Sequence, residues 1–167
     1  MKHLSKLLST AGIAAVALLA APAMAISEGQ MAPEISLPGK SGTVRLSALR
    51  GKLVYVDFWA SWCEPCKESF PWLNEMQSKY GPAGLQVIGV NVDANRADAD
   101  KFLGSVPAKF TIAYDSKGET PSAFGVKGMP SSYLVAPDGK VVLVHAGFSD
   151  NDKAELEGKI KAALVKK

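Results

Sequence analysis

The feature that most constrains the fold is an apolar segment that leads directly into two cysteines. Residues 53–59 (Leu-Val-Tyr-Val-Asp-Phe-Trp) are apolar apart from one acid, and Cys63 and Cys66 follow after a short interval. An apolar run of this length, rich in Val and aromatic residues, predicts a strand buried on both faces of a sheet. Pro65 lies between the cysteines, and proline is well tolerated in the first turn of a helix. We therefore expect a buried strand, a turn and a helix that begins at the cysteine pair.

A disulfide between these cysteines would be a poor structural staple. The chain has 167 residues and no other cysteine, and only two residues separate the pair. A bridge that closes so short a loop removes little entropy from the unfolded chain. Disulfide-stapled domains are mostly small and carry several bridges, whereas a chain of this length can bury a core of its own. Redox chemistry explains the cysteine pair better.

Metal binding and haem attachment lack the residues that they need. Structural zinc usually takes four ligands, and after the N-terminal segment only His145 and carboxylates remain, none of them at ligand spacing. Attachment of a c-type haem requires a histidine directly after the second cysteine, where this chain has Lys67. We expect no metal and no cofactor other than a redox-active Cys63–Cys66 disulfide. We expect His145 to be a strand residue and Lys67 a solvated helix charge.

The first 25 residues carry the three-part pattern of a secretory signal peptide. Two lysines precede a short apolar stretch, and Ala23-Met24-Ala25 then offers small residues at the positions that a signal peptidase reads. The apolar stretch is short for a membrane span. We predict a signal peptide at residues 1–25 and one domain at residues 26–167, with an uncleaved N-terminal anchor as the alternative.

The charge balance gives little support to nucleic-acid binding. The whole chain carries 19 Lys and Arg against 16 Asp and Glu, a net charge of +3. Removal of residues 1–25 takes away Lys2 and Lys6 and no acid, which leaves 17 basic against 16 acidic residues. No cluster of basic residues interleaved with aromatic ones remains, and we expect no nucleic-acid partner.

The rest of the chain alternates predicted strands and helices. Residues 34–37 and 43–46 alternate polar and apolar side chains across a Pro-Gly segment, which predicts a hairpin with one buried face. Further strands are expected at 85–92, 110–114, 132–136 and 140–145, and helices at 47–51 (a single turn), 64–80, 95–103, 118–124 and 153–165. This order predicts one α/β domain in which helices flank a mixed sheet.

Two segments resemble the thioredoxin superfamily. Residues 57–67 (Asp-Phe-Trp-Ala-Ser-Trp-Cys-Glu-Pro-Cys-Lys), followed by Pro71, resemble its active-site segment almost position by position. Met129-Pro130, which precedes a predicted strand, resembles its cis-proline loop. The resemblance implies a thioredoxin-like α/β sandwich and thiol-disulfide exchange.

Three further features resemble a narrower group, the exported TlpA/ResA-like thiol-disulfide oxidoreductases. They are the N-terminal hairpin, the Leu-Arg-Gly-Lys sequence at residues 49–52, and the additional helix after Asn91-Val92-Asp93. The resemblance extends from about Gln30 to the C-terminus. It implies a thioredoxin-like fold with an added N-terminal β-hairpin and one inserted helix.

The three expected catalytic residues are Cys63, Cys66 and Asp57. At a helix N-terminus the thiolate of Cys63 is stabilised by unpaired backbone N–H groups and the helix dipole, so we assign it as the attacking thiol. Cys66, one turn further, is the resolving thiol. Burial of Asp57 in a strand raises the pKa of its carboxyl. The resemblance implies that this carboxyl accepts the proton of the buried cysteine; an acid that reaches solvent at the strand end is the alternative.

Five neighbouring residues are expected to bind substrate or to tune the site: Trp62, Glu64, Pro65, Met129 and Pro130. The resemblance implies that the Met129–Pro130 peptide bond is cis and that the backbone of Met129 contacts the substrate. We expect Trp59 and Trp62 to shield the sulfurs, with Trp62 at the surface; alternatively, either one is a plain core or rim residue. The charge of Glu64 suits a helix N-terminus but opposes a thiolate at Cys63, which favours the disulfide form and indicates a reductant. Alternatively, Glu64 points into water.

The predicted function is that of a periplasmic thiol-disulfide oxidoreductase that reduces disulfides in exported proteins, of the cytochrome c maturation type. The resemblance implies apocytochrome c as a possible class of substrate and a membrane-bound electron donor for re-reduction. A disulfide-forming oxidase is one alternative, although the segment between Asp93 and Phe110 is too short for the helical domain of DsbA-like proteins. A thiol-based copper metallochaperone is another, although it would need a wider cysteine spacing and a well-placed histidine. A peroxidase lacks its P-x-x-x-T-x-x-C pattern here.

Overall fold

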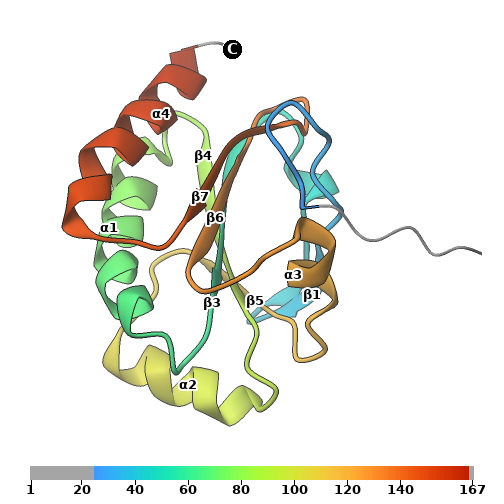
Figure 1. Ribbon diagram of the computed structural model, residues 1–167, viewed down its shortest axis with the longest axis vertical. Coiled ribbons are helices and arrows are strands. Elements are labelled where there is room, and N and C mark those ends of the chain that lie inside the picture. Colours follow the sequence, from blue (N-terminus) through green and yellow to red (C-terminus); the bar gives the residue numbers. More distant parts are fainter. Residues whose placement is uncertain (1–24, 166–167) are drawn as a thin grey trace, which may run out of the picture.

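The computed structural model describes residues 25–165. It has a central sheet with helices on both faces (Figure 1). The predicted signal peptide, except for its last residue, lies outside that range. The sheet has seven strands in the order β2-β1-β5-β4-β3-β6-β7. In chain order they are β1 (Ser36–Gly39), β2 (Gly42–Arg45), β3 (Leu53–Trp59), β4 (Leu85–Asn91), β5 (Thr111–Tyr114), β6 (Ser131–Val135) and β7 (Val141–Ala146). Strands β3, β4 and β5 run parallel, and the remaining pairings are antiparallel, so the sheet is mixed as predicted.

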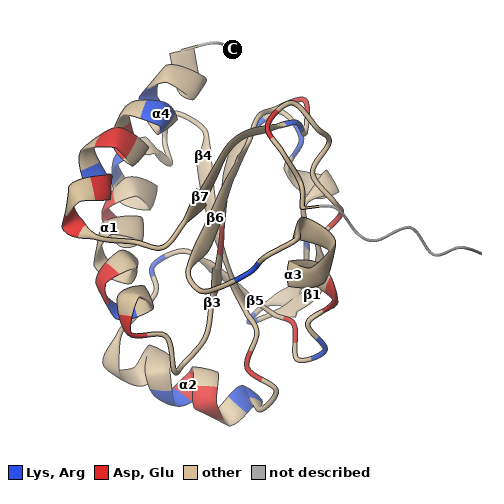
Figure 2. Ribbon diagram, in the orientation of Figure 1, with Lys and Arg blue, Asp and Glu red and all other residues tan. Residues whose placement is uncertain are grey.

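Apart from η2, which was not predicted, the helices occupy the predicted places in the chain. They are η1 (Ser47–Leu49), α1 (Glu64–Tyr80), α2 (Arg96–Ser105), α3 (Glu119–Phe124), η2 (Asp150–Asp152) and α4 (Lys153–Val165), where η denotes a single 3-10 turn. Basic and acidic residues are intermixed along α1, α2 and α4 (Figure 2). Among residues 25–165, no helix combines the length and the apolar character needed to cross a bilayer.

The N-terminal hairpin is present, but its turn is tighter than predicted. The strands pair up to Gly39 opposite Gly42, so only two residues form the turn in place of the expected five. Gly42 closes the turn with φ of +119°, a conformation that glycine adopts without steric cost. The apolar residues Ile35, Leu37, Val44 and Leu46 pack against the core cluster on the α3 side of the sheet, which confirms the buried face.

Strand β3 lies in the middle of the sheet and is buried at every residue, as the apolar run predicted. Its odd-numbered side chains Leu53, Tyr55 and Trp59 join a core cluster with residues of α1, α2 and α4. Its even-numbered side chains join a second cluster that includes Phe124 of α3. Because successive side chains of a strand alternate between faces, a run buried on both faces needs no polar alternation.

The strand arrangement brings the predicted site residues to one edge of the sheet, the edge that is formed by the ends of its strands. The carboxyl ends of β3 and β4 meet there, with Trp59 opposite Asn91. Strand β6 is antiparallel to β3 and pairs Ser131 with Phe58, so its first residues lie at the same edge. The loop that precedes β6 therefore lies level with the turn that leads from β3 to the cysteines.

Candidate active site

Cys63 and Cys66 form a disulfide at the N-terminus of α1. Cys63 is the capping residue, with an extended backbone, and its carbonyl accepts a hydrogen bond from the Cys66 N–H at 3.2 Å. The N–H of Cys63 in turn donates to the carbonyl of Ala60 at 3.1 Å. Cys66 is fully buried and Cys63 is 3% exposed, so only Cys63 offers surface to an incoming thiol or disulfide.

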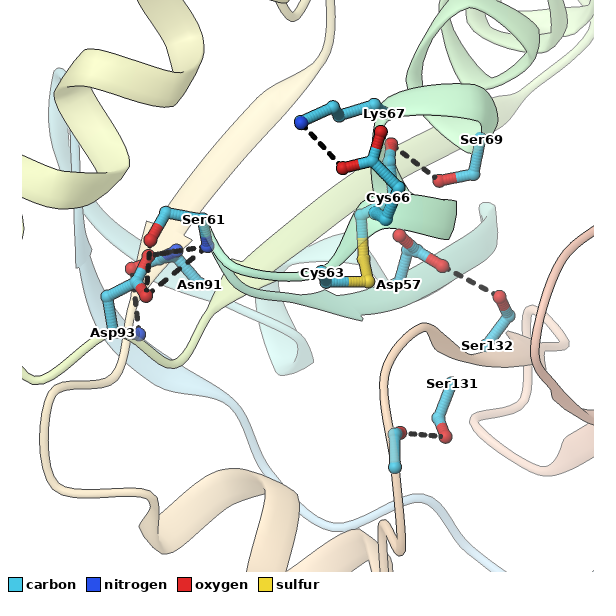
Figure 3. Close-up of a disulfide and its surroundings, with 12 residues drawn as sticks. Asp57, Ser61, Cys63, Cys66, Lys67, Ser69, Asn91, Asp93, Ser131 and Ser132 are labelled. Atoms are coloured by element: carbon cyan, nitrogen blue, oxygen red, sulfur yellow. Dashed lines mark hydrogen bonds and ion pairs between the residues drawn. A yellow bond between two sulfur atoms is a disulfide. The ribbon is translucent and has the colours of Figure 1, made fainter.

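The first turn of α1 carries an ion pair beside the disulfide. Lys67 Nζ lies 2.6 Å from Glu64 Oε2, and both side chains are exposed (Figure 3). Lys67 is thus a solvated helix charge, as expected, but it is paired with Glu64. The cation offsets much of the repulsion that Glu64 would exert on a thiolate at Cys63. Pro65 occupies the first turn, where its missing N–H removes no helical hydrogen bond.

Asp57 is buried in β3, and one of its two carboxyl oxygens accepts a hydrogen bond. Its side chain is 1% exposed, and Oδ1 accepts a hydrogen bond from Ser132 Oγ at 2.7 Å. Within residues 25–165, Oδ2 has no hydrogen-bond partner. The carboxyl lies between the disulfide and Ser132 (Figure 3). Burial raises the pKa of Asp57 to about 7, against the smaller lowering effect of the Ser132 hydrogen bond. A carboxyl with this pKa can take up and release a proton near neutral pH.

The two tryptophans around the site have different environments. Trp62, directly before Cys63, is 71% exposed, which agrees with the expected surface position. Trp59 is fully buried and packs against Phe70 and Phe102 at ring-centroid distances of 4.9 and 4.8 Å. Trp59 therefore belongs to the core, and Trp62 is the one available to a partner protein.

The loop before β6 contains a cis peptide bond between Met129 and Pro130. The carbonyl of Pro130 accepts a hydrogen bond from the Gly147 N–H at 2.8 Å, and Ser131 Oγ donates to the Gly128 carbonyl at 2.7 Å. Met129 is half-buried and contacts both core clusters. These contacts hold the loop from both sides, at the level of the turn that carries the cysteines.

A second buried carboxylate, which sequence reasoning did not single out, supports that turn. Asp93 accepts hydrogen bonds from the Ser61 N–H at 2.9 Å, from Ser61 Oγ at 2.9 Å and from Asn91 Nδ2 at 2.7 Å. The network fixes the residue two positions before Cys63. The sequence did carry a signal, because the carboxyl ends of neighbouring parallel strands share an edge of the sheet and Asp93 follows one of them.

Ser132 was also missed by the sequence reasoning. It lies opposite Asp57 in the antiparallel pairing of β6 with β3. The sequence contains no local sign of this pairing, because the two residues are 75 positions apart. Only the register of the two strands places the hydroxyl on the carboxylate.

Of two cavities on the surface of the described residues 25–165, the smaller is lined by Ser61 and Lys67, which lie on either side of the cysteine pair in the chain. It measures about 290 Å³ and separates the turn before the disulfide from α2; its lining includes Ser61, Lys67 and Phe102. The larger one, about 660 Å³, lies between the N-terminal hairpin and β5 and has no residue of the site in its lining. Neither cavity is lined by Cys63, Cys66 or Asp57.

A sequence profile of the redoxin family matches residues 27–160. The chain belongs to the redoxin family. Among its relatives, the thiol-disulfide oxidoreductase ResA of Bacillus subtilis is 35% identical over 123 residues, which cover 73% of this chain and 69% of ResA. ResA of Oceanobacillus iheyensis is 30% identical over 132 residues, with 76% and 69% covered.

A solved structure is also similar to this chain in sequence and fold. The crystal structure of a protein from Chlorobium tepidum, assigned as a thiol:disulfide interchange protein DsbE, is 56% identical and superposes with a TM-score of 0.82. The match covers 84% of this chain and 99% of the Chlorobium chain. Together with the Cys63–Cys66 disulfide, these matches identify a TlpA/ResA-like member of the thioredoxin superfamily and an enzyme of thiol-disulfide exchange.

The geometry bears on the alternative functions as well. The segment between β4 and β5 holds one helix of ten residues, α2, where DsbA-like oxidases carry a helical domain. Among residues 25–165, no group of three or more His, Cys, Asp or Glu side chains is arranged to share a metal ion.

Proposed function

We propose that this enzyme is an exported reductant of disulfides in exported proteins, of the cytochrome c maturation type. The observation that carries the proposal is a cysteine pair at a helix N-terminus with a buried carboxyl of raised pKa behind it. The similarity to proteins named ResA and DsbE supports the same class of reaction. The short insertion at α2 favours a reductant over a DsbA-like oxidase.

The reduced enzyme acts in two steps. The Cys63 thiolate attacks one sulfur of the substrate disulfide, and the other substrate sulfur leaves as a thiolate. Asp57 then accepts the proton of Cys66, and the Cys66 thiolate attacks Cys63 Sγ and releases the second substrate sulfur. Two electrons pass from the cysteine pair to the substrate, and the enzyme is left with the Cys63–Cys66 disulfide.

The neighbouring residues recognise the substrate chain. The exposed Trp62 ring and the backbone of Met129 form the contact surface beside Cys63. Because the enzyme ends each cycle oxidised, it requires an electron donor in an oxidising compartment. The resemblance to TlpA/ResA-like proteins implies that this donor is bound to the membrane. Apocytochrome c whose cysteine pair is oxidised to a disulfide is the expected class of substrate.

The reduction potential of the Cys63–Cys66 couple tests the direction of electron flow. Equilibration of the purified protein with glutathione and with dithiothreitol at pH 7 gives this value. We expect a potential at or below about −270 mV, the value for thioredoxin. A potential near about −120 mV, the value for DsbA, would contradict the proposal and identify an oxidase.

The order of the two cysteines is tested by trapping. A Cys66→Ser variant keeps the attacking thiol and loses the resolving one, so it should accumulate mixed disulfides with its substrates. The matched Cys63→Ser variant should accumulate none. Non-reducing gels followed by mass spectrometry of the trapped species identify the substrates. Equal trapping by both variants would overturn the assignment.

A further inference from the structure

A row of polar side chains leads from Asp57 across the sheet toward its edge. Asp57 on β3 is paired with Ser132 on β6, and Ser132 is paired with His145 on β7. Directly opposed residues of antiparallel strands project from the same face, with Cβ atoms about 4.5–5.5 Å apart. On the other side of Asp57, the paired residue of β4 is Gly89, which has no side chain. The row therefore runs in one direction only, toward β7.

His145 connects the interior with solvent. Its side chain is 25% exposed, yet its Nε2 atom is buried and has no hydrogen-bond partner in the part of the chain that the structure describes. The exposed area therefore belongs to other atoms of the side chain. Nε2 lies 3.8 Å from Oδ2 of Asp152, the last residue of η2. Asp152 is itself held by the N–H and the hydroxyl of Ser149, at 2.7 and 2.8 Å, so the carboxylate has a fixed place beside the ring.

Asp57 has no direct contact with water through which to exchange a proton. It is 1% exposed, and the face of the sheet on which it lies is covered by apolar residues of α1 and α4, among them Trp72, Leu73, Leu156 and Ile160. An acceptor that takes a proton from Cys66 in every cycle must also release it in every cycle. The release therefore requires polar side chains that reach the surface.

We propose that Ser132 and His145, beside Asp152, form the path by which protons leave Asp57 and return to it. The inference rests on the proposed function, in which Asp57 accepts the Cys66 proton. A serine hydroxyl has one proton to donate. It donates to Asp57 while that carboxyl is ionised. Nε2 of His145, which makes no hydrogen bond within residues 25–165, is the acceptor for it once Asp57 is protonated.

The transfer conserves protons and moves no electrons. Protonated Asp57 gives its proton to Ser132 Oγ, and the Ser132 hydroxyl proton passes to His145 Nε2. The imidazolium forms next to the Asp152 carboxylate, which stabilises it. The ring then loses a proton to water on its exposed side. In the reductive half of the cycle, the same steps run in reverse and reprotonate Asp57.

Tyr55 is the other titratable group on this face of β3. Burial raises the pKa of Tyr55 far above its usual range; the Asp57 and Asp152 carboxylates raise it further, and Ser132 lowers it. The carboxylates at both ends of the row therefore act on the Tyr55 phenol, and it stays protonated. On α1 the titratable group at Asp57 is Cys66 in its reduced form, and no ion pair within residues 25–165 involves Asp57.

The test asks whether the rate of disulfide formation at pH 8 depends on the pH at which the reduced enzyme was held beforehand. Reduced protein is held at pH 6 or at pH 8, then mixed at pH 8 with excess bis(2-hydroxyethyl) disulfide, and the formation of Cys63–Cys66 is followed by tryptophan fluorescence. The wild type should react equally fast from both starting conditions. In Ser132→Ala and His145→Gln, protein taken from pH 6 should react at least about tenfold more slowly, because Asp57 retains its proton.

The controls separate this path from structural damage. A structural defect slows the reaction from both starting conditions equally, and the path is overturned if neither variant distinguishes them. Ser132→Thr, which keeps the hydroxyl, and Val144→Ala, the neighbour of His145 on the opposite face of β7, should behave as the wild type. Asp57→Asn should be slow from both conditions. If Asp57→Asn is as fast as the wild type, the role of Asp57 fails, whatever the other variants show.

Discussion

Two buried aspartates on either side of the cysteine turn show how the same residue takes opposite roles. Asp93 is 6% exposed and Asp57 is 1% exposed. Asp93 accepts hydrogen bonds from the N–H and the hydroxyl of Ser61 and from the amide of Asn91, so both of its oxygens are occupied. Among the described residues, Asp57 accepts one hydrogen bond, from Ser132, and its second oxygen accepts none.

The number of donors decides the chemistry of each carboxyl. Hydrogen bonds to an ionised carboxylate favour the charged form, and burial without them favours the neutral form. Asp93 is a fixed acceptor that holds the turn before Cys63. At Asp57 burial dominates and raises the pKa to about 7, so its charge changes in the range in which the thiols react. One carboxylate holds the cysteine turn, and the other is able to exchange a proton with it.

The largest expected effect is a difference in kinetics between the two amide variants. Asp57→Asn should slow the resolution of a mixed disulfide at pH 8 by about 100-fold or more, since it removes the proton acceptor. In the wild type this rate should rise as the pH increases through about 7. In the variant that rise should disappear. Quenched flow with acid trapping of the Cys63 mixed disulfide measures the rate.

Asp93→Asn is the matched control for the kinetics. It changes a carboxylate of similar burial on the other side of the turn and leaves Asp57 in place. It should slow resolution by less than about tenfold, because it removes no proton acceptor. An equal loss of rate in both variants would show that the two carboxylates do not differ in role.

The next effect is on stability, where Asp93→Asn should have the larger effect of the two variants. Asp93→Asn should lower the free energy of unfolding of the oxidised protein by about 2–3 kcal/mol at pH 7, because it loses hydrogen bonds to a charged acceptor and sets an N–H₂ group against a donor. Urea unfolding followed by fluorescence measures this. A loss below about 0.5 kcal/mol, typical of a surface site, would contradict the assignment.

The pH dependence of stability should reveal the titration of Asp57. The pKa of Asp57 is raised in the folded state, so between pH 4 and 7 the folded protein binds more protons than the unfolded chain and loses stability as the pH rises. A pKa increase from 3.8 to about 7 corresponds to a loss on the order of 4 kcal/mol across that range. Asp57→Asn should remove this part of the decline, as urea unfolding at a series of pH values would detect. An unchanged profile would place the titration elsewhere.

The smallest effect is expected at the exposed acid between the cysteines. Glu64→Gln should shift the equilibrium of the cysteine pair with glutathione toward the dithiol by less than about twofold, because surface ion pairs contribute little. Lys67→Gln leaves Glu64 unpaired and should shift the equilibrium toward the disulfide. A shift of more than tenfold in either variant would show that the ion pair at the helix start, and not the buried carboxyl, dominates the redox balance.

Much of the site was predictable because it is local in the chain. The apolar run 53–59, Pro65 and the helical spacing that follows are signals within a few residues of one another, and they give strand β3, the turn and α1. The hairpin was predicted with a longer turn, since the pattern of Pro38 to Gly42 does not reveal that Gly42 adopts a positive φ. The sequence could also have predicted that the end of β4 lies beside the end of β3, and therefore that Asp93 lies near the site.

The sequence by itself determined that two cysteines begin a helix after a buried strand that contains an acid. These features follow from propensity and periodicity, which act over short stretches of chain. Only the tertiary structure decided what surrounds that acid. Ser132 and His145 reach the row of Asp57 through the registers of β6 with β3 and of β7 with β6. Register between distant strands is set by the packing of whole faces of the sheet, and so no local pattern contains it.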